Sequence, residues 1–264
     1  MRYSTLSFIV GLSLLFSSCQ GPVNHHHAPA HGTHPGLYAT LFQQQSAEYK
    51  ALCYQAFNIA ELRLNERLKD KIEKPLAIVV DIDETVLDNS PYQAQGILDH
   101  FDYPVKWDVW MNSASAEVVP GALEFLKDAS TRGVKIFYIS NRRGVYRDPT
   151  LKNLKDLDFP DAVNENILLL TDEKDKEPRR QQVMQNYEIL MLMGDNLGDF
   201  HSIFDSNDAQ VREDFTLESL DNFGKTWIVL PNPLYGTWMD ALPGIKEARE
   251  HKDDAYLEQG LKGF

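Results

Sequence analysis

Residues 77–85 of this chain read AIVVDIDET. The four apolar residues predict a buried strand, because strands of a parallel sheet are hydrophobic along most of their length. Asp81 and Asp83 follow at once, and side chains two apart on an extended chain point the same way. Two carboxylates that close need a cation or a proton between them. The stretch therefore predicts a strand that ends in a reactive pair, although a polar turn or a helix cap would give the same pattern.

Four further apolar runs predict the remaining strands of the sheet, at residues 134–139, 167–170, 189–193 and 227–230. Stretches with helical spacing separate these runs, so we expect an α/β fold whose parallel sheet is covered on both faces. The helix before the second run begins near Pro120 and ends at Gly133. Residues 37–74 lack glycine and proline and predict one or two helices that pack on the main domain.

Polar residues follow the predicted strands in a specific order. Ser140, with Asn141 and Arg142 beside it, ends the second run, and Lys176 lies in a charged stretch after the third. The fourth run ends in GDNLGDF (residues 194–200), which adds a second carboxylate pair. Each feature alone fits a helix cap, a solvated lysine or an acidic loop. Together they supply the hydroxyl, the fixed positive charge and the metal ligands that a phosphoryl-transfer site needs.

These blocks resemble the motifs of the haloacid dehalogenase (HAD) superfamily. In chain order they are Asp-x-Asp-x-Thr, a strand ending in serine, a lysine and Gly-Asp-x-x-x-Asp. Residues 83–92 (DETVLDNSPY), 119–121 (VPG) and 194–200 closely resemble the bacterial class C acid phosphatases, and the resemblance runs from about residue 43 to residue 244. It implies a HAD-like Rossmannoid parallel sheet flanked by helices, with N-terminal helices and a small helical cap at about residues 88–118, between the first two motifs. The implied activity is Mg²⁺-dependent hydrolysis of small phosphomonoesters through an aspartyl-phosphate, with nucleoside monophosphates or nicotinamide mononucleotide as the first candidates.

The resemblance also assigns roles to the four aspartates. Asp81 is expected to be the nucleophile, and Asp83 the general acid and then the general base. Asp81, Asp195 and the backbone carbonyl of Asp83 are expected to bind Mg²⁺, with Asp199 supporting the ion through a water. Because Asp83 must carry a proton in the first step, we expect a mildly acidic pH optimum.

Further contacts to the substrate follow from the same resemblance. Ser140 is expected to donate to a phosphoryl oxygen and Lys176 to neutralise the transferring group and Asp81. Asn141 and Arg142 are expected near the substrate. Thr85 is expected to orient Asp83 by a hydrogen bond, with a role as a helix cap as the alternative.

Two aromatic residues are expected to bind the leaving group. By resemblance, Trp107 and Tyr235 sandwich a nucleobase, since stacking on aromatic rings tolerates many bases; ordinary packing of both rings is the alternative. Two other functions stay open at this point. One is a broad aryl-phosphate or phosphotyrosine phosphatase, and the other is a noncatalytic surface lipoprotein that binds a ligand such as haem.

The N-terminal residues predict export and anchoring. Residues 1–18 resemble a bacterial lipoprotein signal peptide, which implies cleavage before Cys19 and lipid attachment to its sulfur; a soluble secreted protein is the alternative. Gln20 favours the outer membrane of a Gram-negative bacterium, facing the periplasm or the exterior. Residues 19–36 predict a histidine-rich flexible tether, and residues 37–264 the phosphatase domain.

Composition limits the partners. The formal net charge of −13 argues against a groove for nucleic-acid polymers but permits a small phosphorylated substrate beside a cation. We therefore expect a small phosphomonoester and, through Cys19, the membrane as partners, and the sequence leaves a homodimer open. After processing, Cys53 is the one remaining cysteine, so the core alone must hold the fold.

Overall fold

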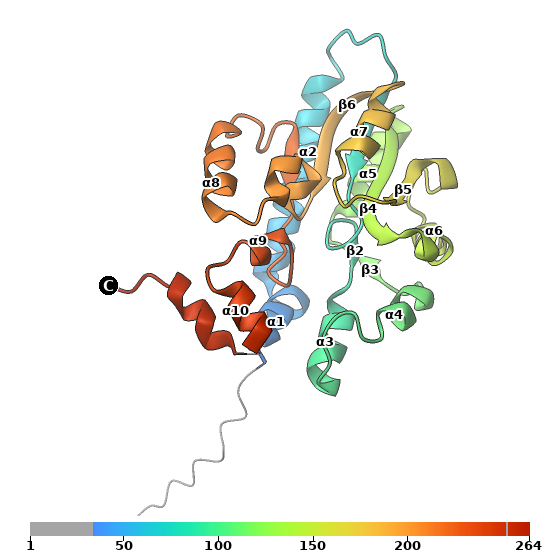
Figure 1. Ribbon diagram of the computed structural model, residues 1–264. Coiled ribbons are helices and arrows are strands. Elements are labelled where there is room, and N and C mark those ends of the chain that lie inside the picture. Colours follow the sequence, from blue (N-terminus) through green and yellow to red (C-terminus); the bar gives the residue numbers. More distant parts are fainter. Residues whose placement is uncertain (1–33, 252) are drawn as a thin grey trace, which may run out of the picture. The chain divides into compact units, whose positions relative to one another are not determined.

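A computed structural model describes residues 34–251 and 253–264, which form an α/β domain (Figure 1). Its main sheet has the strand order β5-β4-β1-β6-β7, and every neighbouring pair is parallel. The predicted parallel sheet and its five strands are confirmed. Their bounds are β1 Leu76–Val80, β4 Lys135–Arg143, β5 Ile167–Leu170, β6 Glu188–Gly194 and β7 Trp227–Val229.

The helices connect these strands and lie around the sheet. Both expected N-terminal helices are present, and Ser46 separates them, its hydroxyl accepting from Tyr49 N at 3.0 Å as the N-cap of the second. The helices are α1 Leu37–Gln45, α2 Ala47–Arg67, α3 Ser90–Asp99, α4 Trp107–Ser113, α5 Ala122–Thr131, α6 Arg147–Asp156, α7 Glu177–Met184, α8 Ala209–Glu218, α9 Thr237–Asp240 and α10 Ile245–His251.

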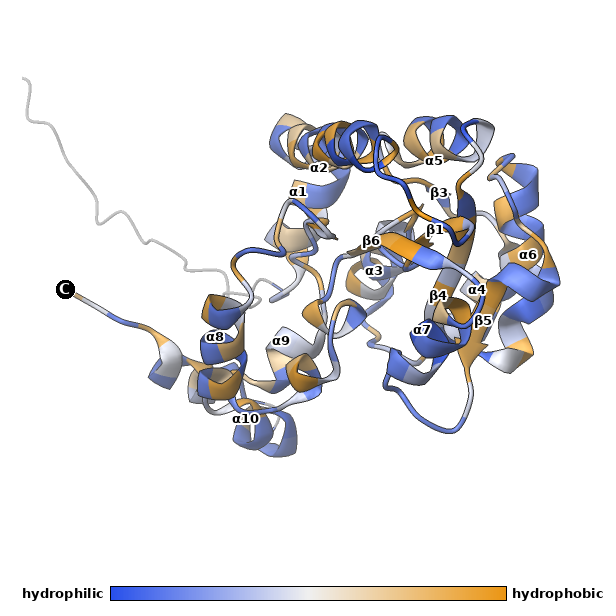
Figure 2. Ribbon diagram, turned by 90° about the horizontal axis from the view of Figure 1, so that it is seen from above, coloured by the Kyte–Doolittle hydropathy of each residue, from blue (hydrophilic) through white to orange (hydrophobic). Residues whose placement is uncertain are grey.

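Alternate residues of β1 face opposite sides of the sheet. Ile78 and Val80 belong to the large core formed with α2, α5 and α6, whereas Ala77 and Val79 pack with Val183 of α7 on the other face. In Figure 2 the strands are largely hydrophobic, and the helices around them carry many hydrophilic residues. Because both faces are covered, only the strand ends are left for polar side chains.

The segment between the first two motifs forms a small substructure. Strands β2 (Leu87–Asp88) and β3 (Glu117–Val118) pair antiparallel, and helices α3 and α4 lie between them in the sequence. Trp107, at the start of α4, packs edge-on against Tyr92 and Tyr103, with ring centroids 4.9 and 5.6 Å apart. These aromatic contacts hold α3 to α4, at the position predicted for the cap.

The strand that carries Ser140 differs from the prediction. The sequence places its end at residue 139, but β4 continues to Arg143. Its register against β5 shifts between Ile139 and Arg143. Ser140 and Arg142 therefore lie within an irregular stretch of β4 and not after its end.

The predicted signal peptide, the lipidated Cys19 and most of the predicted tether lie outside the described residues and stay predictions. Among the residues that are described, none of the helices has both the length and the apolar character needed to span a bilayer.

Candidate active site

A tight loop after β1 carries the first carboxylate pair. The amide of Asp81 donates to the carbonyl of Met193 at 2.9 Å, which joins the loop to the end of β6. The Ile82 carbonyl then accepts from the amides of Val86 and Leu87 at 3.0 and 2.9 Å, so the chain reverses within a few residues. This reversal holds Asp81 and the residues that follow it at the carboxyl edge of the sheet.

Three carboxylates from two strand ends converge at this edge. One oxygen from each of Asp81, Asp195 and Asp199 lies within 4.8 Å of the others. A Cβ at Gly194 would lie 2.3 Å from Asp199 Oδ2, so the close approach of Asp199 to the end of β6 requires glycine there. The structure therefore brings together Asp81 and Asp195, the two expected carboxylate ligands, and places Asp199, expected to support the ion through a water, equally close.

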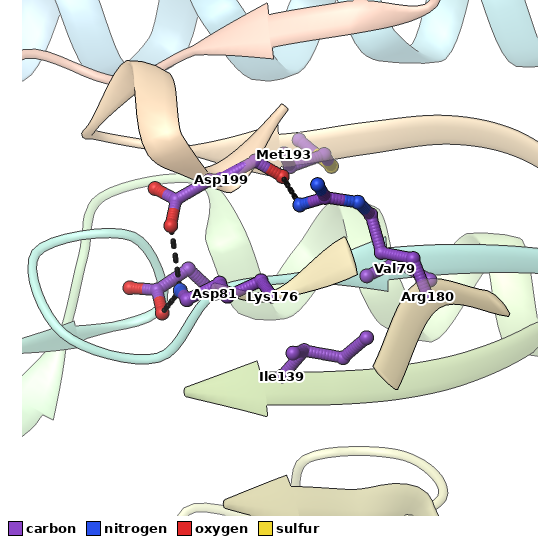
Figure 3. A pocket seen from close by; sticks show the side chains of 7 residues that line it. All are labelled: Val79, Asp81, Ile139, Lys176, Arg180, Met193 and Asp199. Carbon is purple, nitrogen blue, oxygen red and sulfur yellow. Dashed lines mark hydrogen bonds and ion pairs between the residues drawn. The ribbon is translucent and has the colours of Figure 1, made fainter. Parts of the chain in front are cut away.

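Lys176 joins two of these carboxylates. Its ammonium donates to Asp81 and, at 2.5 Å, to Asp199 Oδ1, and the side chain is almost fully buried (Figure 3). Lys176 is the N-cap residue of α7, which packs against β4 and β6. The lysine therefore reaches the site from a third segment, and it points at the carboxylates instead of into solvent.

Burial determines the electrostatics of this cluster. Loss of water raises the pKa of Asp81 to about 7, although the Lys176 ammonium lowers it in part. The pKa of Asp195 is raised well above its usual value by burial and by the Asp199 and Asp81 carboxylates. One ammonium thus leaves a cluster of three carboxylates with unbalanced negative charge, and hard oxygen ligands of this kind suit a divalent cation such as Mg²⁺.

Asp83 lies in a different environment from Asp81. Arg142 donates to both Asp83 oxygens at 2.9–3.1 Å, and Ser140 Oγ donates to Asp83 Oδ2 at 3.1 Å. Asn89 Nδ2 adds a bond to Oδ1 at 2.7 Å. Burial raises the pKa of Asp83, but the Arg142 charge and these hydrogen bonds outweigh it, so the pKa lies below the usual value. Ser140 and Arg142, expected beside the substrate, both bond the second aspartate.

Thr85 makes a different contact from the one expected. Its hydroxyl donates to Asp195 Oδ1 at 3.2 Å and not to Asp83, so the expectation that it orients Asp83 is wrong. Asn232 Nδ2 donates to the other Asp195 oxygen at 2.7 Å. Both oxygens of Asp195 are therefore held by neutral donors from segments on either side of it in the sequence.

The first turns of α7 connect the site to the end of β4 and to the loop after β6. Arg179 donates to the Ser140 carbonyl at 2.8 Å and to Asn141 Oδ1 at 2.7 Å, and Arg180 donates to the Asp199 carbonyl at 2.7 Å. Both guanidinium groups are buried, whereas Asn141 is exposed. The two arginines fix the backbones that carry Ser140 and Asp199 to the helix that carries the lysine.

The two aromatic residues predicted to sandwich a nucleobase, Trp107 and Tyr235, make separate contacts in the structure. Among the described residues, the ring of Trp107 meets those of Tyr92 and Tyr103, and the hydroxyl of Tyr235 donates to Glu84. Glu84 is fully buried, and burial raises its pKa to about 8. Part of the Trp107 ring is therefore covered by Tyr92 and Tyr103. Tyr235 instead contacts Glu84, the residue that follows Asp83.

Sequence reasoning missed four residues that shape this site: Asn89, Arg179, Arg180 and Asn232. Asn232 follows the predicted strand 227–230 by two positions, and the rule that polar residues after strands bear function could have found it. The buried arginines lie within a charged stretch that looks solvated, so nothing local distinguishes them.

The arrangement supplies a complete set of groups for phosphoryl transfer. Asp81 offers an oxygen nucleophile, and Asp83, two residues later, offers a proton carrier in a separate environment. Lys176 provides fixed positive charge, and the three converging carboxylates could hold a metal ion. Groups fixed in this way need no rearrangement when charge develops on a reacting group.

Comparison with known proteins gives the same interpretation. The class C acid phosphatase from Bacillus anthracis is 42% identical, with TM-scores of 0.82 and, in a structure with tungstate bound, 0.83. Each alignment covers 87% of this chain and 97% of that chain. Residues 24–238 match the family described as HAD superfamily, subfamily IIIB (acid phosphatase). This chain therefore belongs to the subfamily IIIB acid phosphatases of the HAD superfamily and is a phosphomonoesterase.

Proposed function

We propose that this acid phosphatase uses Mg²⁺ to hydrolyse small phosphomonoesters, with nucleoside monophosphates or nicotinamide mononucleotide as preferred substrates. The observation that carries the proposal is the convergence of Asp81, Asp195 and Asp199 around one point, with the Lys176 ammonium bonded to two of them. The relative with tungstate bound supports it, because tungstate and phosphate are both tetrahedral oxyanions.

The proposed reaction has two steps. An oxygen of Asp81 attacks phosphorus in line, the bond to the leaving oxygen breaks, and Asp83 gives that oxygen a proton. Asp83 then takes a proton from water, whose oxygen attacks the aspartyl-phosphate and releases inorganic phosphate. Lys176 holds Asp81 in place and offsets the negative charge of the transferring group.

The donor set fits Mg²⁺, because three carboxylates supply oxygen ligands and the ion keeps part of its water shell. Asp81, Asp195, Asp199 and the carbonyl of Asp83 would hold it. Bound there, the ion would polarise phosphoryl oxygens and neutralise charge that Lys176 alone leaves unbalanced.

Removing the nucleophile is expected to abolish turnover. Asp81→Asn keeps the size of the side chain but not its nucleophilic oxygen, so phosphate release should fall at least about 1,000-fold. Circular dichroism should show an unchanged fold. Asp158→Asn is the matched control: Asp156 and Asp158 repeat the Asp-x-Asp spacing, and the Asp158 side chain is 87% exposed. Activity of Asp81→Asn near that of the control would reject the assignment.

Removal of divalent cations is expected to stop the reaction reversibly. Phosphate release should be lost after treatment with a chelator and return when Mg²⁺ is added in excess, because the three carboxylates need a counter-charge. Melting temperature should rise with added Mg²⁺, since an ion that binds only the folded state stabilises it. Equal phosphate release with chelator and with Mg²⁺ would refute the metal site.

The pH dependence should follow the Asp83–Arg142 pair. Arg142 favours the ionised form of Asp83 and lowers its pKa. Because Asp83 must be protonated to act as the general acid, kcat should fall as rising pH removes that proton. In Arg142→Gln the pKa of Asp83 should rise, and the alkaline limb of the kcat profile should shift to higher pH by about one unit. Arg249→Gln, which removes an exposed ion pair between α10 and Asp240 of α9, is the control. An unmoved limb would argue against Asp83 as the general acid.

A substrate panel separates the proposed specificity from its nearest rival. We expect kcat/KM for adenosine monophosphate to exceed that for phosphotyrosine and for glycerol 2-phosphate, because a purine offers the largest flat surface for stacking. The measurement is phosphate release at fixed enzyme concentration. A preference for phosphotyrosine would indicate the broad aryl phosphatase instead.

A further inference from the structure

Glu84 has no part in the proposed chemistry, yet it lies directly after Asp83 and is fully buried. Its backbone has φ +55°, in the left-handed region that side chains other than glycine rarely adopt. The carboxylate accepts from the Asn89 amide at 2.9 Å, from Asn89 Nδ2 at 3.0 Å and from the hydroxyl of Tyr235. Burying a carboxylate costs free energy unless such donors surround it. Asn89 and Tyr235 in turn need the Glu84 carboxylate as the acceptor that holds their side chains in place.

Asn89 connects this carboxylate to the cap. Besides Glu84, its Nδ2 donates to Asp83 Oδ1 at 2.7 Å, and its Oδ1 accepts from the indole nitrogen of Trp110 at 2.8 Å. Trp110 belongs to α4, and Asn89 is fully buried. One amide thus links the proposed proton donor, the Glu84 carboxylate and a cap helix.

Tyr235 connects the same carboxylate to the C-terminal segment. Asn232 donates to Asp195 at 2.7 Å and accepts from the amides of Leu234 and Tyr235. Thr237 Oγ1 donates to Asn196 Oδ1 at 2.7 Å. Residues 232–237 are therefore bonded, on both sides of Tyr235, to Asp195 and Asn196 in the loop after β6. The bond from Tyr235 to Glu84 joins the same segment to the loop after β1.

We propose that Glu84 is a positioning residue that holds the Tyr235 ring beside Asp83 and thereby controls which leaving groups bind. This inference rests on the proposed function: the leaving oxygen must approach Asp83 to receive its proton, so the rest of the leaving group lies near the residues that Glu84 holds. Tyr235 is half-buried, which leaves ring surface for a flat group. Glu84 acts on recognition and not on phosphoryl transfer.

Tyr235→Phe isolates this contact, because it removes the hydroxyl and keeps the ring. KM for adenosine monophosphate should rise about 10-fold with little change in kcat, and this rise should be several times larger than the rise in KM for glycerol 2-phosphate. Glu84→Gln replaces one of the two carboxylate oxygens and so also weakens the contacts to Asn89; KM for adenosine monophosphate should rise at least as much as in Tyr235→Phe. The double variant should be no worse than Glu84→Gln alone, because both changes affect the contact between Glu84 and Tyr235. Tyr54→Phe, on the exposed face of α2, is the control.

Equal loss on both substrates, a change in kcat alone, or additive effects in the double variant would overturn the inference. Hydrogen exchange supplies a measurement that needs no turnover. Amides of residues 234–240 should exchange faster in Tyr235→Phe than in the parent or in Tyr54→Phe, and unchanged exchange would also refute the proposal that the contact with Glu84 holds this segment. If the parent protein releases no phosphate from either ester, the proposed function fails, and the exchange result alone decides whether Glu84 holds this segment.

Discussion

The ion pairs of Lys176 are the interaction on which the rest of the site depends. A carboxylate buried without a partner would be ionised only at a large cost in free energy, and this site buries Asp81 and Asp199 close together. The Lys176 ammonium bonds both, and it comes from the start of α7 rather than from either of their strands. Removing one partner of a buried ion pair typically costs about 3–5 kcal/mol, because the other charge stays uncompensated. The lysine therefore makes it possible for two acidic strand ends to meet.

Around this ion pair, each reactive group is held by residues that do not react. Arg142 and Asn89 fix Asp83, while Thr85 and Asn232 fix Asp195. The two aspartates of the first motif consequently have opposite pKa shifts, upward for Asp81 and downward for Asp83. Groups of one chemical type can then take different roles because their surroundings differ. Such prearranged donors and charges stabilise a transition state without the cost of reordering them during the reaction.

The sequence predicted the elements well because their signals are local. Apolar runs bounded by polar residues marked all five strands of the main sheet, and Pro120 and Gly133 bracketed α5. It predicted β4 less well, because the apolar run ends at Ile139 while the strand continues through polar residues to Arg143, where its register against β5 is irregular. The order of the motif blocks likewise placed Asp81, Lys176 and Asp195 at one edge of the sheet, because parallel strands bring their carboxyl ends together.

By itself, the sequence determined the fold class, the family and the residues that meet at the strand ends. Only the tertiary structure decided which residue bonds which: Thr85 bonds Asp195 instead of Asp83, Arg142 bonds Asp83, and Tyr235 reaches Glu84 across a separation of 151 residues. The physical reason is the range of the forces involved. Strand and helix patterns follow from the spacing of neighbouring side chains, whereas a hydrogen bond between distant segments depends on how whole loops pack, and a small displacement exchanges one donor for another.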